Sequence, residues 1–102
     1  MTEKKTEVCE AFVRGEVAHG NNSVSTGTAL FLHGTTIARK NARGEIEGTV
    51  ANYPSRTTIS HLNMLCNVAG VSQRFFTMHG YRYYGKRLGY FKPVADDQWV
   101  RL

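Results

Sequence analysis

Apolar side chains recur at every second position over several short stretches of this chain, and glycines separate those stretches. This alternation is typical of strands that bury one face. Residues 28–40 are predicted to form one strand with a bulge at Gly34, or two short strands. Residues 41–44 are a predicted hairpin turn, after which residues 45–52 return as a further strand.

The last third of the chain is also strand-like. Residues 71–79, 81–84 and 90–92 are rich in aromatic residues, and Gly80 and the segment 85–89 separate them. Short strands joined by turns of this kind favour antiparallel pairing. The sequence therefore predicts a small antiparallel sheet.

Two segments instead have the spacing of helices. The first begins at a Thr6 cap and ends at Gly15, and the second begins at a Thr57 or Thr58 cap and ends before Gly70. Both place apolar residues three and four apart, so each is expected to pack one face against the sheet.

These elements predict an α+β fold with an antiparallel sheet of about four to six strands and two short helices on one side. A chain of 102 residues has the usual length of one domain, so residues 1–102 are expected to form a single domain with a frayed end at residues 1–5. Residues 16–27 are rich in Gly, Asn and Ser and are predicted to be a surface loop.

The charge is uneven along the chain. Thirteen Lys and Arg against eight Asp and Glu give a formal charge of +5. No carboxylate side chain lies between Glu47 and Asp96, whereas six Lys and Arg do. This half is expected to be electropositive and to favour polyanions or acidic protein surfaces.

Cys9 and Cys66 are far apart and fall on apolar faces of the predicted helices, where buried thiols are common. No apolar run near the N-terminus is long enough for a signal peptide or a membrane span. We therefore expect free thiols, a cytoplasmic location and no membrane partner.

Three short motifs suggest chemistry that the rest of the sequence does not support. Residues 80–86 match Gly-x4-Gly-Lys of a phosphate-binding loop, but Arg87 replaces the metal-binding Ser or Thr. His33-Gly34-Thr35 resembles one half of a paired His-x-Thr phosphoesterase signature without its second half. His61 and Cys66 lack the spacing of a zinc pair on a helix. We expect no enzyme activity, no cofactor and no metal.

Basic and aromatic residues alternate in the last third of the chain. On a strand, Phe76 would point away from Phe75, and Tyr81 and Tyr83 would point away from Arg82 and Tyr84, so one face can be core while the other is exposed. Such residues can stack on bases and contact phosphates, or anchor a protein interface. They can equally be the core of a small sheet. The candidate binding residues are Arg74, Tyr81, Arg82, Tyr83, Tyr84, Lys86, Arg87 and Lys92.

The middle of the chain contains a pattern of residues by which it resembles a known family. It comprises Gly20-Asn21, Thr26-Gly27, Leu30-Phe31-Leu32-His33-Gly34, Ile37-Ala38, Tyr53-Pro54, Thr57-Thr58 and Leu62-Asn63. In these residues the chain resembles a family of small proteins of unassigned activity encoded by bacteriophages and related mobile elements. The last third departs from the family's Trp-Tyr and Asn-Gly hairpin. The resemblance implies a phage accessory protein made in an infected bacterial host, of the size that binds and disables a host enzyme or defence complex.

Two functional classes remain open. The first is an inhibitor, of the anti-defence or anti-CRISPR kind, that binds a host protein or ribonucleoprotein and blocks it sterically. The alternative is a nucleic-acid-binding module in which the five Arg and Lys candidates contact phosphates and the tyrosines stack on bases. The oligomeric state is left open by the sequence.

Overall fold

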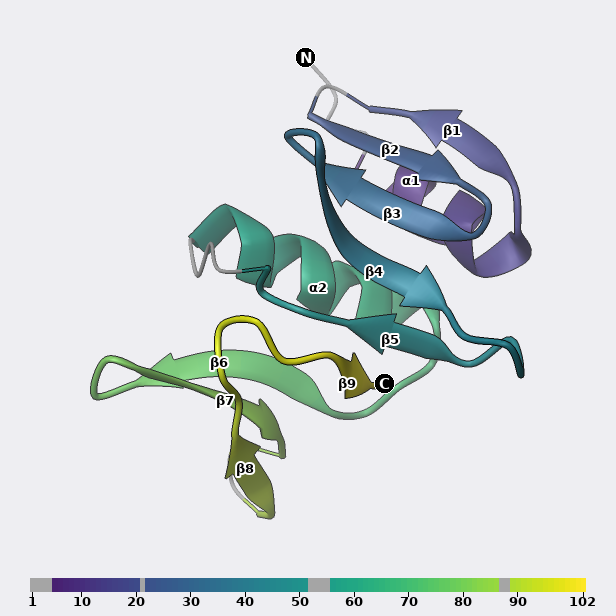
Figure 1. Cartoon of the computed structure of the whole chain (residues 1–102). Helices are drawn as coiled ribbons and strands as arrows, with labels where there is room; N and C mark the ends of the chain where they lie inside the picture. The colour runs from purple at the N-terminus through teal and green to yellow at the C-terminus, as the bar shows by residue number, and fades with distance from the viewer. Residues whose placement is uncertain (1–4, 21, 52–55, 87–88) are drawn as a thin grey trace.

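The computed structural model describes residues 5–20, 22–51, 56–86 and 89–102, which form two helices and nine strands (Figure 1). The elements in chain order are α1 Lys5–Arg14, β1 Val17–His19, β2 Ser23–Thr26, β3 Ala29–Leu32, β4 Thr35–Lys40, β5 Ile46–Gly48, α2 Arg56–Val68, β6 Arg74–Met78, β7 Tyr81–Gly85, β8 Phe91–Pro93 and β9 Val100–Arg101.

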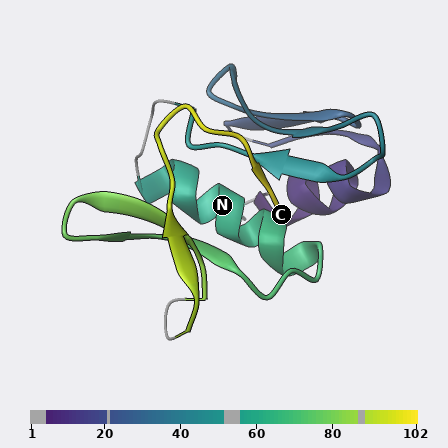
Figure 2. The ribbon, with the colours of Figure 1, turned by 60° about the horizontal axis from the view of Figure 1, so that its bottom comes forward.

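The strands form two antiparallel sheets. The six-stranded sheet has the order β1-β2-β3-β4-β5-β9, and the three-stranded sheet has the order β6-β7-β8. The C-terminal segment leaves β8 and crosses back to β5, where Gly48 pairs with Val100 (Figures 1 and 2). The last strand of the chain therefore belongs to the first sheet and links the two.

Both helices lie on one side of the six-stranded sheet, and α2 also contacts β6 of the three-stranded sheet (Figure 2). The core lies in this layer, where Phe12 of α1, Leu30 and Ile37 of the sheet, and Leu62 and Leu65 of α2 are all buried. The α+β class and the antiparallel pairing are confirmed. The helices form because their apolar residues face this shared core.

Two-residue turns close the hairpins β3–β4 and β6–β7. His33-Gly34 and His79-Gly80 have positive φ at both residues, which is the requirement of a type I′ turn. Residues 28–40 thus form two strands, the second of the two predicted forms. The bulge lies between Leu30 and Phe31 instead of at Gly34.

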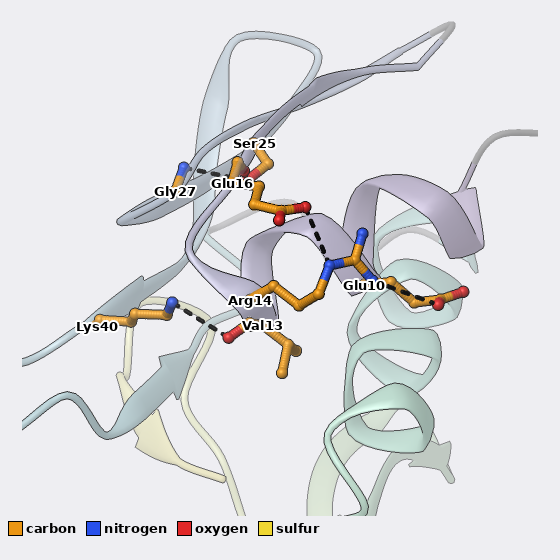
Figure 3. Close-up of polar contacts among 7 residues, drawn as sticks. All are labelled: Glu10, Val13, Arg14, Glu16, Ser25, Gly27 and Lys40. Atoms are coloured by element: carbon orange, nitrogen blue, oxygen red, sulfur yellow. Dashed lines mark hydrogen bonds and ion pairs between the residues drawn. The ribbon is translucent and has the colours of Figure 1, made fainter.

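The prediction of a surface loop at residues 16–27 is wrong, because β1 and β2 form an antiparallel hairpin there. Ser25 is buried, and its hydroxyl donates to the Glu16 carbonyl at 2.8 Å and accepts from the Gly27 amide at 3.1 Å (Figure 3). A small hydroxyl that bonds to the backbone can replace an apolar residue in a strand. The polar composition therefore concealed two strands. The six-stranded sheet agrees with the expected four to six strands, and the three-stranded sheet is additional to it.

The end of α1 is fixed to the sheet by charged side chains. Arg14 forms ion pairs with Glu16 at 3.0 Å and with Glu10 at 3.7 Å, and the ammonium of Lys40 donates to the Val13 carbonyl at 3.4 Å (Figure 3). A cation near the last carbonyls of a helix is favourable. The Lys40 contact joins α1 to β4, while Arg14 pairs within α1 and with the residue that precedes β1.

Smaller differences concern the ends of elements. Lys5 is helical and its ammonium donates to the Ser60 hydroxyl at 2.5 Å, so the frayed end does not extend to this residue. The expectations for residues 1–4, and for the segment containing Asn52 and Pro54, lie outside the described residues.

Candidate functional site

One face of the three-stranded sheet carries a set of aromatic residues outside the core. Phe76 pairs with Tyr83 and Met78 pairs with Tyr81 across β6 and β7, while Phe91 lies opposite Gly85 on β8. Residues that pair, or that lie two apart on a strand, share a face. We call Phe76, Met78, Tyr81, Tyr83 and Phe91 the outer aromatic face.

Three rings of the outer aromatic face contact one another. The Phe76 and Tyr83 rings stack with centroids 5.6 Å apart, and Phe91 meets them edge-on at 5.3 and 5.2 Å. All three are half-buried, and none belongs to the core cluster. Tyr81 is 67% exposed.

The helix α2 lies on the other side of this sheet, and no described element covers the outer aromatic face (Figure 2). An uncovered aromatic patch on a small protein is a typical mark of an interaction site.

The inner face of the same sheet packs into the core. Phe75 and Tyr84 are paired, with ring centroids 4.6 Å apart, and Tyr84 is only 8% exposed. The prediction that Phe75 and Phe76 point to opposite faces, and that Tyr83 and Tyr84 do so as well, is confirmed. Tyr84 therefore lies away from the surface that would stack on a ligand. Burial raises the pKa of its hydroxyl to about 12.

Two of the candidate arginines are bound within the protein. The Arg82 guanidinium makes a two-pronged contact with Asp96, with nitrogen–oxygen distances of 3.0 Å in each bond. Arg74 donates to the carbonyls of Val71 and Gln73. Both side chains are half-buried; the charge of Arg82 is paired with Asp96, whereas the bonds described for Arg74 are to backbone carbonyls.

Two candidate lysines are exposed near the β7–β8 hairpin. Lys86 follows β7 and Lys92 lies on β8, where its ammonium is 5.7 Å from the centroid of the exposed Tyr90 ring. Arg87 lies outside the described residues. Among the described candidates, the exposed cations are therefore Lys86 and Lys92.

The sheet is attached to the scaffold by Asn63 of α2. The Asn63 amide donates to the Phe75 carbonyl at 2.8 Å and accepts from the Phe75 amide at 2.7 Å. Because β6 is an edge strand, this one side chain satisfies backbone groups that would otherwise lack a strand partner.

The sequence-based choice of candidate residues omitted Phe76, Met78 and Phe91. The sequence did contain evidence for two of them, because Phe76 and Met78 lie two positions apart and therefore point to the same face of their strand. What the sequence did not contain was the pairing of β8 with β7, which brings Phe91 to the same face.

The residues considered for chemistry are dispersed. Burial raises the pKa of the Cys9 thiol to about 12 and that of Cys66 to about 11, so both stay protonated at neutral pH. Among the described residues, no three His, Cys, Asp or Glu side chains gather as a metal site requires.

His33 lines a hollow of about 180 Å³ together with Leu32, Thr35, Ile37, Ala51 and Thr58. In the part of the chain that the structure describes, no second histidine lines this hollow.

The fold and its uncovered sheet face define a small α+β protein built from two linked antiparallel sheets. The family model of the Kyanoviridae Gp96 protein matches residues 1–99. The chain belongs to this family of phage proteins, which confirms the bacteriophage origin that the resemblance implied.

No curated protein and no solved structure matches the chain. None of the described helices has the length and apolar character needed to cross a membrane.

Proposed function

We propose that this phage protein acts by binding a protein of the infected host, alone or within a ribonucleoprotein, and blocks it sterically through the outer aromatic face. The observation that carries the proposal is the cluster of Phe76, Tyr83 and Phe91, whose rings contact each other on the sheet face opposite α2 and lie outside the core cluster of the described residues. Aromatic residues and Met are enriched in the centres of protein interfaces.

The charges around the cluster support a protein partner over a polyanion. Nucleic-acid binding needs several cations free to neutralise phosphates. Arg74 and Arg82 bind groups within the protein, which leaves Lys86 and Lys92 as the exposed cations among the described candidates. Lys92 pairs with Tyr84 and so lies on the inner face of the sheet, which leaves few exposed cations near the outer aromatic face and favours a protein partner.

A pull-down with matched variants tests this function. The baits are the wild-type protein, Tyr81→Glu and Val17→Glu, incubated with nuclease-treated lysate of infected host cells. Tyr81 and Val17 are 67% and 68% exposed and lie in different sheets, so the same substitution is tolerated equally by the fold. Circular dichroism verifies that all three are folded.

We expect a defined host protein to be retained by the wild type and by Val17→Glu, and to be lost with Tyr81→Glu. Retention by Tyr81→Glu at the wild-type level would place the interface elsewhere and refute the proposal. Loss of all retained material after nuclease treatment would favour the nucleic-acid-binding alternative.

A further inference from the structure

A groove lies where the C-terminal segment crosses the inner side of the three-stranded sheet. It has a volume of about 280 Å³ and is bounded by β7, β8 and the segment that leads into β9. Figures 1 and 2 both show this segment running beside the sheet on its way from β8 to β5. We call it the junction groove. It lies on the opposite side of the sheet from Phe76 and Tyr83.

Part of the wall of the junction groove is apolar. Tyr84, Val94 and Val100 line it, and all three pack in or against the core. Tyr90, which directly precedes β8, also lines the groove and is 68% exposed. An exposed ring beside an apolar wall suits a planar ligand that can stack.

Polar groups that recognise a base edge lie beside this wall. Gln73 and Gln98 both line the groove. The Gln98 oxygen accepts from the Ala95 amide at 3.1 Å, which holds the side chain in place and leaves its NH₂ group to donate. Side-chain amides are the groups that pair with the donors and acceptors of nucleobases.

The groove is positively charged. Lys92 and Arg101 line it, and none of its described lining residues is acidic. Arg101 forms one ion pair, through Nη1 to Glu45 at 3.0 Å, and its other guanidinium donors are not used by that bond. Lys92 carries an exposed charge, and the remaining donors of the exposed Arg101 can bind an anion in addition to Glu45, so the groove favours an anionic ligand, and a phosphate above all.

We propose that the junction groove binds one nucleotide unit, with its base stacked on Tyr90 and its phosphate on Lys92 and Arg101. The volume is at the lower end for small-molecule sites, which fits a single unit better than a larger cofactor. The unit comes either from a free nucleotide or from one position of a single strand. This site is independent of the outer aromatic face and of the protein partner proposed there.

Titration of the isotope-labelled protein with AMP, followed by amide chemical shifts, tests the proposal. We expect shifts centred on Gln73, Tyr90, Lys92 and Gln98. Lys92→Glu and Tyr90→Ala each weaken binding about tenfold or more, because one removes a charged contact and the other a stacking surface. Both residues are exposed, so both variants retain the fold.

The matched control is Lys86→Glu, since Lys86 is an exposed lysine near the same hairpin that does not line the groove. Its effect on AMP binding should stay within about twofold. Equal loss in Lys86→Glu and Lys92→Glu would show that only the general positive charge matters and would overturn the proposal.

Two further probes, a short oligoadenylate and inorganic phosphate, show where the nucleotide unit comes from and whether its base is recognised. Binding of AMP as tightly as a short oligoadenylate assigns the site to free nucleotides, and much tighter binding of the oligonucleotide assigns it to a single strand; either result supports the site. Inorganic phosphate that binds as tightly as AMP would refute base recognition. Absence of shifts with every probe at millimolar concentration would also overturn the proposal.

Discussion

The two sheets of this protein differ in how they are held. The six-stranded sheet is covered on one side by α1 and α2, and the buried hydroxyl of Ser25 bonds to the backbone at its polar first hairpin (Figure 3). The three-stranded sheet is attached through its inner face and one edge, and its other face carries contacting aromatic rings with no described element over them. The first sheet is built for stability, whereas the second keeps apolar surface available.

The sharpest way to break this comparison is to remove one aromatic ring from each region. Phe12 is fully buried in α1, and Phe12→Ala should lower the free energy of unfolding by about 3–5 kcal/mol. Phe91 is half-buried on the outer aromatic face, and Phe91→Ala should cost about 1 kcal/mol through its lost ring contacts. Urea denaturation measures both. Equal losses would mean that the outer rings are a second core.

The attachment of the second sheet depends on Asn63. Asn63→Ala leaves the amide and carbonyl of Phe75 without their side-chain partner, so we expect a loss of about 1–3 kcal/mol. Amide hydrogen exchange should accelerate at Phe75 before it does in β3 or β4. The control is Asn67→Ala, which makes the same change at an exposed position one turn later in α2. If both variants behave alike, Asn63 does not anchor the sheet.

The sequence predicted the local pairing well and the long-range contacts poorly. Consecutive side chains of a strand point to opposite faces, so the sequence alone was sufficient to predict that Tyr83 and Tyr84 lie on opposite faces of the sheet. The hairpin at residues 41–44 was also confirmed, with the Asn41 side chain accepting from the amides of Arg43 and Glu45.

Other features depend on residues that come together only in the folded chain. The engagement of Arg82 needs Asp96, which is fourteen positions away and on a segment that follows β8. The strands at residues 16–27 were missed because Ser25 satisfies its hydroxyl through tertiary contacts that composition does not reveal. The sequence therefore identified the region of the candidate surface, but only the structure showed which of its residues are exposed.

The smallest expected effect concerns the hydroxyl of Tyr84. This group is buried, and among the described residues it has no hydrogen-bond partner. Tyr84→Phe should therefore leave the stability at pH 7 unchanged or raise it by up to about 1 kcal/mol, since an unsatisfied polar group is removed from the core. Tyr83→Phe, which changes a half-buried ring on the outer aromatic face, is the matched control.

Alkaline titration sharpens the same point. In the folded protein, burial raises the pKa of Tyr84 from 10.0 to about 12, so the folded state keeps this proton while the unfolded state loses it. The stability linked to Tyr84 is thus complete below pH 10 and is lost as the pH rises toward 12. Cys9 and Cys66 act in the same direction from pH 9.0 upward, because burial raises both thiol pKa values. Denaturation between pH 8 and 11 should show a steady loss of stability that is shallower above pH 10 in Tyr84→Phe; an identical slope in the two proteins would mean that the Tyr84 hydroxyl reaches water.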